Sequence, residues 1–147
     1  MAASKKIRKF KWWYACLIAL AVFIGFIVVV FVGVFAGTSG AVAETEDFFA
    51  RIAAGEDLAA VYEDTTELFQ ENTTLPVFVQ IIETYPMLSD VESFTFNNRS
   101  IETTSYGPTA ELSGTVYSTS GDSAPVEIQV IKEDGEWKVT YFALTSE

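Results

Sequence analysis

The sequence contains no histidine and only one cysteine, Cys16. Histidine is the side chain best suited to proton transfer near neutral pH and the commonest zinc ligand, so its absence argues against most metal-centred and triad chemistries. Cys16 lies within an apolar stretch, so the residues that follow this stretch carry neither a thiol nor a disulfide. Any domain formed by those residues must be stabilised by packing alone.

Positive charge is scarce and lies mostly at one end of the chain. The 147 residues include 9 lysines and arginines against 20 acidic residues, a net charge of −11. Five of the cations precede Trp12, namely Lys5, Lys6, Arg8, Lys9 and Lys11. From Glu44 onward four cations oppose all twenty acidic residues, and this part has a net charge of −16. Such a surface is repelled by phosphate backbones, so we expect no nucleic-acid partner, and any charged partner should be basic.

A long uncharged run, Trp12 to Thr38, follows the basic tail. At 1.5 Å per residue a helix over residues 14–36 would be about 34 Å long, enough to cross a hydrocarbon core of about 30 Å. Trp12, Trp13 and Tyr14 suit the headgroup level, and the basic tail before them favours the cytoplasmic side. The pattern predicts a single-pass plasma-membrane protein in contact with the lipid bilayer. Its expected parts are a cytoplasmic tail (1–11), a transmembrane helix (12–37), an exit linker (38–43) and an extracytoplasmic domain (44–147).

The apolar segment has other interpretations. Ala41, Val42 and Ala43 have the small-x-small form of a signal-peptidase site, although the apolar run exceeds the usual 7 to 15 residues and so favours retention. A lipoprotein anchor at Cys16 is disfavoured because the residues before it are not small and aliphatic. A pilin-like subunit would carry a glutamate near the start of the run, and this sequence has none there.

Three glycines indicate where a partner helix could approach. Gly33 and Gly37 have the small-x-x-x-small spacing of closely packed membrane helices, and Gly25 lies earlier in the same run. We therefore predict a helix–helix contact at Gly25, Gly33 and Gly37. The alternative is that Gly37 only makes the end of the helix flexible.

Helical signals fill the first half of the outer part. Acidic residues from Glu44 predict a helix start and Gly55 its end, while Asp57 is suited to cap a second helix. Thr65 and Thr66 form another capping pair before Leu68 and Phe69. A longer helix is predicted after Thr74, with an apolar side of Leu75, Phe78, Ile81, Ile82 and Tyr85 and a stop at Pro86.

After Pro86 the apolar period changes from that of a helix to two. Four strands are predicted around the alternating residues Phe94 and Phe96; Ala110, Leu112, Gly114 and Val116; Val126, Ile128 and Val130; and Trp137, Val139 and Tyr141. Turn residues at Gly107, Gly121 and Asp134-Gly135 predict hairpins between them. The predicted fold class is therefore α+β, with short helices packed on a curved four-stranded antiparallel sheet.

Several of these segments resemble one known superfamily. They are Asp47-Phe48-Phe49, Gly55-Glu56, Ala60-Val61-Tyr62, Phe78 to Pro86, and the closing hairpin from Lys132 to Val139. Over about Glu44 to Leu144 the chain resembles the NTF2-like (cystatin-like fold) superfamily, especially its small membrane-anchored bacterial members of unassigned function. The resemblance implies a sheet curved into a cone with an apolar pocket. The superfamily contains both enzymes and binding modules, so the fold alone does not select a function.

Catalytic and metal-binding interpretations have candidates but no specific pattern. Donors could be Tyr62, Tyr85, Tyr106, Tyr117 and Tyr141, and bases Asp47, Glu83 and Glu111, but tyrosines in such positions usually pack in the core with a wet hydroxyl. The acidic clusters Glu44-Glu46-Asp47, Glu63-Asp64-Glu67 and Glu133-Asp134-Glu136 lack the residue order of a calcium loop. The sequence therefore predicts no catalytic residue, no cofactor and no metal.

The predicted function is a membrane-anchored binding or accessory module, a subunit or assembly factor of a larger membrane protein complex. The alternative is an NTF2-like enzyme or a carrier of a small apolar ligand that uses the cone pocket. These alternatives differ in structure, because a cone filled by Phe48, Phe78, Ile82 and Trp137 would leave no room for a ligand.

Overall fold

The computed structural model describes residues 12–145, except for the side chains at 12–17 and 30–36. The chain divides into two compact units, one ending at Gly33 and one, the domain, beginning at Val34. Helix α1 (Trp12–Ala53) has residues in both units, and all other described elements belong to the domain.

Three short helices follow α1, and the first two are capped at their starts as predicted. Helix α2 (Leu58–Glu63) starts after Asp57, whose side chain accepts a hydrogen bond from the Ala59 N–H, and α3 (Glu67–Asn72) starts after Thr66, which accepts from Phe69 N–H. Helix α4 (Leu75–Thr84) carries proline in its first turn and ends before Pro86, where a 3₁₀ turn, η1 (Pro86–Asp90), begins. Side-chain oxygens at the starts of α2 and α3 satisfy N–H groups that have no partner within the helix.

The second half of the domain is the predicted meander. Strands β1 (Val91–Thr104), β2 (Gly107–Ser118), β3 (Ser123–Glu133) and β4 (Glu136–Leu144) pair in sequence order, each antiparallel to the next. Asp134 and Gly135, which connect β3 to β4, both have positive φ, the geometry of a two-residue type I′ hairpin turn. The predicted α+β class with a four-stranded antiparallel sheet is confirmed.

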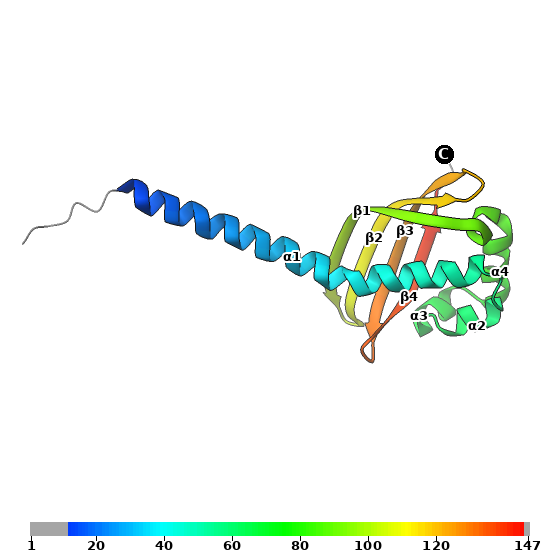
Figure 1. Cartoon of the computed structure of the whole chain (residues 1–147). Coiled ribbons are helices and arrows are strands. Elements are labelled where there is room, and N and C mark those ends of the chain that lie inside the picture. Colours follow the sequence, from blue (N-terminus) through cyan, green and yellow to red (C-terminus); the bar gives the residue numbers. More distant parts are fainter. Residues whose placement is uncertain (1–11, 146–147) are drawn as a thin grey trace, which may run out of the picture. The chain divides into compact units, whose positions relative to one another are not determined.

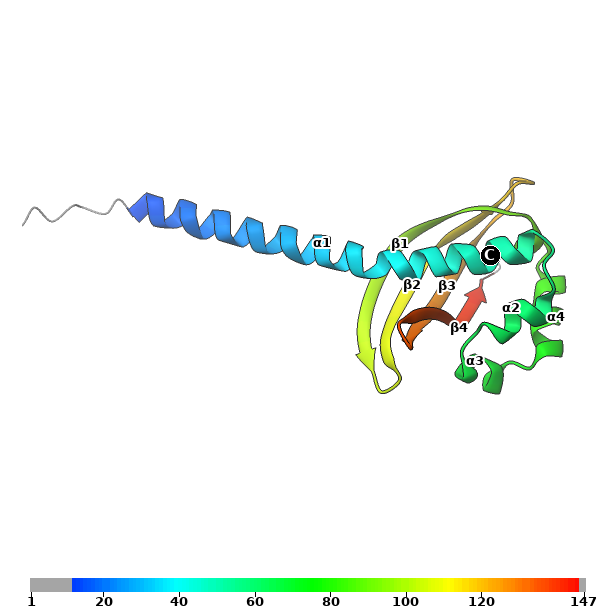
Figure 2. The ribbon, with the colours of Figure 1, turned by 60° about the horizontal axis from the view of Figure 1, so that its bottom comes forward.

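Within the domain the sheet curves around the C-terminal half of α1, and α2, α3 and α4 cover the end near β4 (Figures 1 and 2). The core lies between the helices and the inner face of the sheet. It is formed by Phe48, Phe49, Ile52, Val61, Phe69, Phe78, Ile82 and Leu88 from the helical half and Ala110, Leu112, Val116, Val126, Ile128, Val130 and Val139 from the strands. The period-two alternation of the strands therefore defines an inner, apolar face and an outer, polar face.

The predicted exit linker at residues 38–43 was wrong, because α1 continues through it without a break. Thr38 and Ala41 are fully buried, and the Thr45 hydroxyl donates a 2.9 Å hydrogen bond to the Ala41 carbonyl. A Cβ on Gly40 would lie 2.8 Å from the Trp137 ring. Small residues thus let this stretch of α1 lie close to the sheet, and the packing outweighs the low helix propensity of Thr38, Ser39 and Gly40.

β1 and β2 approach each other closely at Gly114. This residue is paired with Phe96, next to a register shift between Phe96 and Asn98. A Cβ on Gly114 would overlap the carbonyl oxygen of Thr95 and lie 2.8 Å from the Phe96 Cα. The bulge and the absence of a side chain on Gly114 together allow β1 to bend toward its neighbour.

Candidate functional site

The space expected to form a cone pocket is filled by aromatic side chains. Phe78 is fully buried, with ring centroids 6.2 Å from Phe48, 6.0 Å from Phe69 and 6.4 Å from Phe142. Phe142 also lies 5.5 Å from Phe49. Phe48 and Phe78 thus fill the interior as the packing interpretation predicts, and so does Ile82, which is 4% exposed. Such interlocked rings argue against a ligand in this space.

Trp137, the fourth residue predicted for the interior, is only half-buried and lines an open groove along α1 instead. The groove has a volume of about 740 Å³, and its other lining residues are Gly40, Ala43, Glu44, Asp47, Arg51, Asp64, Glu136 and Lys138. Asp47, a candidate base, therefore lies at an open surface among other charged side chains.

Arg51 holds one end of this groove in a fixed geometry. Its guanidinium lies 2.7 Å from Asp64 Oδ2 and pairs with both oxygens of Glu56, at 2.7 and 2.9 Å. Gly55, with φ of 75°, closes α1, and its N–H donates to the Ile52 carbonyl while that of Glu56 donates to the Arg51 carbonyl. This C-terminal cap brings Glu56 next to Arg51. The hydrogen bonds to Glu56, and then to Asp64, raise the pKa of Arg51 further above its ordinary value.

Glu44 lies in the same groove and is strained electrostatically. Burial, followed by the charge of Asp47, raises the pKa of the Glu44 carboxyl above its ordinary value. Since the folded pKa exceeds the unfolded one, ionised Glu44 destabilises the domain at pH above the folded pKa, and this penalty disappears as the pH falls below about 4.5.

We therefore expect Glu44→Gln to increase the free energy of unfolding at pH 7, by less than about 1 kcal/mol because the site is partly solvated. The difference from wild type should shrink as the pH is lowered through the raised pKa toward about 4. Thermal unfolding of the full chain in nonionic detergent at both pH values measures it. Glu83→Gln, at an exposed position of α4, is the control and should show no such pH-dependent gain; a destabilised Glu44→Gln at pH 7 contradicts the assignment.

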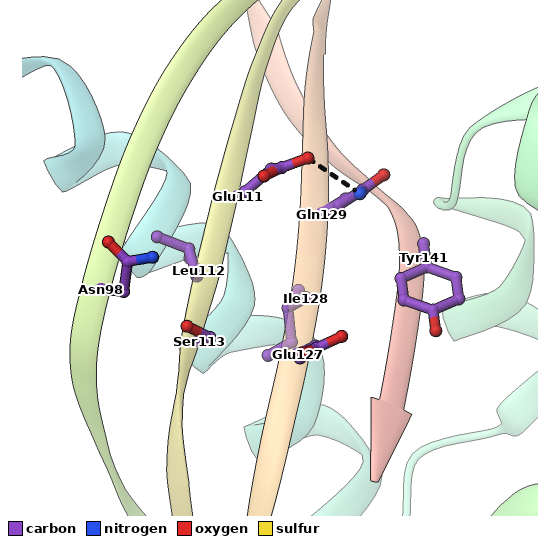
Figure 3. A pocket seen from close by; sticks show the side chains of 8 residues that line it. All are labelled: Asn98, Glu111, Leu112, Ser113, Glu127, Ile128, Gln129 and Tyr141. Carbon is purple, nitrogen blue, oxygen red and sulfur yellow. Dashed lines mark hydrogen bonds between the residues drawn. The ribbon is translucent and has the colours of Figure 1, made fainter.

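A second surface feature is a hollow on the outer face of the sheet, opposite the helices (Figure 3). Two neighbouring cross-strand rows form it. One row is Glu111, Gln129 and Tyr141, and the other is Asn98, Ser113 and Glu127. Its volume is about 330 Å³, and Leu112 and Ile128, whose side chains are buried on the inner face, complete its floor. We call this feature the outer-face hollow.

The outer-face hollow is polar and negatively charged. The Gln129 side-chain amide donates a 3.1 Å hydrogen bond to Glu111 Oε1, and Glu111, Glu127 and Tyr141 are exposed. The structure thus brings together two predicted candidates, Glu111 and Tyr141, but on the solvent face rather than inside the cone. Asn98, Ser113, Glu127 and Gln129 were not predicted as site residues.

The other candidate residues are not brought together. Tyr62 is structural, since its hydroxyl donates a 2.8 Å hydrogen bond to the Thr73 carbonyl. Tyr106 is 65% exposed beside a hairpin turn, and Tyr85 caps the end of α4. Among the residues that the structure describes, no three potential ligands gather in a metal-binding arrangement.

The residues predicted to contact the membrane are only partly described. The basic tail with Lys5, Lys6, Arg8, Lys9 and Lys11, and the side chains of Trp12, Trp13 and Tyr14, lie outside the described residues. The surroundings of Gly33 also lie outside the described residues, and a Cβ on Gly25 would meet no described atom within 4 Å. The helix–helix contact predicted at Gly25 and Gly33 therefore stays a prediction. Gly37 instead lies against Ile101 of β1, whose Cδ1 would be 2.9 Å from a Cβ on Gly37.

Between residues 18 and 29, α1 exposes large apolar side chains. They are Ile18, Leu20, Val22, Phe23, Ile24, Phe26, Ile27, Val28 and Val29, each 39–69% exposed. In the described part of the chain, no helix is both long and apolar enough to cross a membrane. Of the predicted span, residues 14–36, the side chains at 14–17 and 30–36 lie outside the described ones.

Fold and surfaces together define a small α+β domain with a filled core, a polar outer sheet face and a long N-terminal helix that also has residues in a second unit. Residues 34–140 match the family described as Domain of unknown function (DUF4878), and the chain belongs to this family. The match starts where the domain starts, at Val34 within α1. No curated protein matches the chain.

Proposed function

We propose that the chain is a single-pass plasma-membrane protein whose domain is an extracytoplasmic binding or accessory module, a subunit or assembly factor of a larger membrane protein complex. The main support for a membrane anchor is that α1 exposes apolar side chains on all sides between residues 18 and 29. Val22, Phe23 and Ile24 are 67%, 62% and 52% exposed and follow one another at about 100° around the axis. A helix that is apolar all round needs an apolar solvent on every side, which a bilayer supplies.

The packing of α1 inside the domain supports retention of the anchor. A cut after Ala43 would remove Thr38 and Ala41, which are both 0% exposed in the domain. It would also remove Gly40, which lies against Trp137. The folded domain therefore includes residues on both sides of the signal-peptidase-like site.

The accessory role is supported by what the domain offers to other molecules. Its interior is filled by phenylalanine rings, whereas its outer sheet face and the groove beside α1 are open and charged. We propose membership of the NTF2-like (cystatin-like fold) superfamily on the same basis, since short helices within a curved four-stranded meander are what that resemblance implies. Anchoring to the membrane would raise the effective concentration of the domain near other membrane proteins.

Replacing Ile24 and Val28 by arginine should release the chain from the membrane fraction, because each arginine near the centre of a span costs about 2.5–3.5 kcal/mol of insertion free energy. Fractionation after carbonate extraction measures this. Val77→Arg, an equivalent exchange at a 46% exposed position of α4, is the control and should stay in the membrane fraction. A wild-type chain that is extracted by carbonate contradicts the anchor.

Sidedness has its own test. In a Cys16→Ser background, a cysteine at Ser120 should react with a membrane-impermeant maleimide on intact cells, and a cysteine at Ser4 should react only after lysis. The reverse labelling contradicts the proposed orientation.

The accessory role has a separate test, in which the chain is solubilised from its native membrane in mild detergent. A monodisperse monomer with no other membrane protein bound contradicts this role.

A further inference from the structure

The outer-face hollow contains two carboxylates that have no cation of their own. In the described part of the chain, the salt bridges join Arg51 to Glu56 and Asp64, and Lys138 to Glu133. None reaches Glu111 or Glu127.

All four cations of the domain are engaged elsewhere. Besides Arg51 and Lys138, Lys132 lies 5.8 Å from the centroid of the Trp137 ring, and Arg99 lies 5.9 Å from that of Phe96. Among the described residues, none of the salt bridges or cation–π contacts of these four cations involves Glu111 or Glu127. Such carboxylates, one on each of two neighbouring strands, attract a positive group from outside.

The remaining side chains of the hollow favour one kind of cation. Gln129 already donates to Glu111 Oε1, so the second oxygen of Glu111 and the carboxylate of Glu127 remain as acceptors. The Tyr141 ring lies in the same cross-strand row as Glu111 and is 45% exposed. A guanidinium is planar, donates bidentately to carboxylates and stacks on aromatic rings, whereas an ammonium does neither as well. The hollow, about 330 Å³, also has room for one long side chain rather than a large ligand.

We propose that the outer-face hollow is a docking site for an arginine side chain of a protein partner, held by Glu111, Glu127 and Tyr141. This inference rests on the proposed accessory function and gives its partner a chemical identity. Because exposed ion pairs are weak individually, the site acts as a low-affinity contact that becomes effective when both proteins share one membrane.

The test uses the full chain in nonionic detergent micelles and a short, neutral-dye-labelled peptide with two arginines, followed by fluorescence anisotropy. Matched peptides carry two lysines or two glutamines in place of the arginines. We expect the arginine peptide to bind, the lysine peptide to bind several-fold more weakly, and the glutamine peptide not to bind. Raising the salt concentration should weaken binding of the arginine peptide.

The variant Glu111→Gln/Glu127→Gln should weaken binding of the arginine peptide about tenfold or more. Its control is Glu71→Gln/Glu83→Gln, which removes the same charge from exposed positions of α3 and α4 and should leave binding within about twofold. Tyr141→Leu should weaken binding about threefold or more through loss of the ring. Circular dichroism checks that all three variants remain folded.

Three outcomes overturn the proposal. In the first, both double variants weaken binding equally, which indicates attraction by net charge alone. In the second, peptide binding appears only after the five tail cations are changed to glutamine, which indicates that the chain's own tail occupies the hollow. In the third, the arginine peptide does not bind but a neutral oligosaccharide does, with Tyr141 required. Membrane fractionation of the same variants is unaffected by any of these results, so failure here is separable from failure of the proposed anchor.

Discussion

Replacing Gly114 by alanine is expected to lower the free energy of unfolding of the domain by about 3 kcal/mol or more, a large fraction of the roughly 5–15 kcal/mol that is typical of a folded domain. The new methyl group would overlap the carbonyl oxygen of Thr95 and crowd the Phe96 Cα. Both are backbone atoms of β1, so no side-chain rotation can relieve the clash, and β1 must move away from β2. The loss is therefore larger than for an ordinary glycine-to-alanine change in a strand.

Thermal unfolding of the full chain in nonionic detergent measures this effect, with loss of the cooperative transition as the extreme result. Ser113→Ala, one residue away on the outer face, keeps the same strand and should cost less than about 0.5 kcal/mol. Gly25→Ala, with open space around the new methyl group, should be equally mild. A Gly114→Ala protein that melts within a few degrees of wild type contradicts the close approach of β1 and β2.

Phe78→Ala is expected to have the other large effect, a loss of about 3–5 kcal/mol in the free energy of unfolding. Phe78 is fully buried, and its ring contacts those of Tyr62, Phe69 and Phe142 at centroid distances of 5.8, 6.0 and 6.4 Å. Alanine would leave a cavity that surrounding rings from three elements can fill only in part.

The neighbouring Val77→Ala provides the control for Phe78→Ala, because Val77 lies on the same helix but is 46% exposed. It should change stability by less than about 1 kcal/mol. Urea unfolding followed by circular dichroism compares the two. Equal midpoints for both variants would mean that the space between helices and sheet is not filled as described, and would reopen the cone-pocket alternative.

Most of the fold could be predicted from local pattern. The alternation of Leu112 and Val116, and of Val126 and Ile128, marked the strands, and Asp134-Gly135 marked a turn whose geometry it favours. The continuation of α1 through residues 38–43 could not be predicted in this way. Thr38, Ser39 and Gly40 are typical of a helix end, and contacts with distant strands, such as that of Gly40 with Trp137, keep this stretch helical.

Only two residues of the candidate site, Glu111 and Tyr141, were among the candidates that the sequence offered, and the location of the site was not predicted. Glu111 and Tyr141 were recognised as chemically useful, yet assigned to the cone. Since Leu112 points to the core, its neighbour Glu111 must point outward, and the same parity applies to Glu127 and Gln129 beside Ile128. That alternation was the signal that could have identified the outer-face hollow. No sequence pattern indicated the salt bridge between Arg51 and Asp64, because this contact depends on how α1 packs against α2.

The position of Phe142 has a consequence for how the domain forms. This ring lies on β4, the last strand, and contacts rings from α1, α3 and α4. During synthesis the helical half emerges first, and its aromatic side chains acquire Phe142 as a partner only after β4 has been made. The core of the domain therefore closes only once β4 is in place, and until then the helical half exposes aromatic side chains that the folded domain buries.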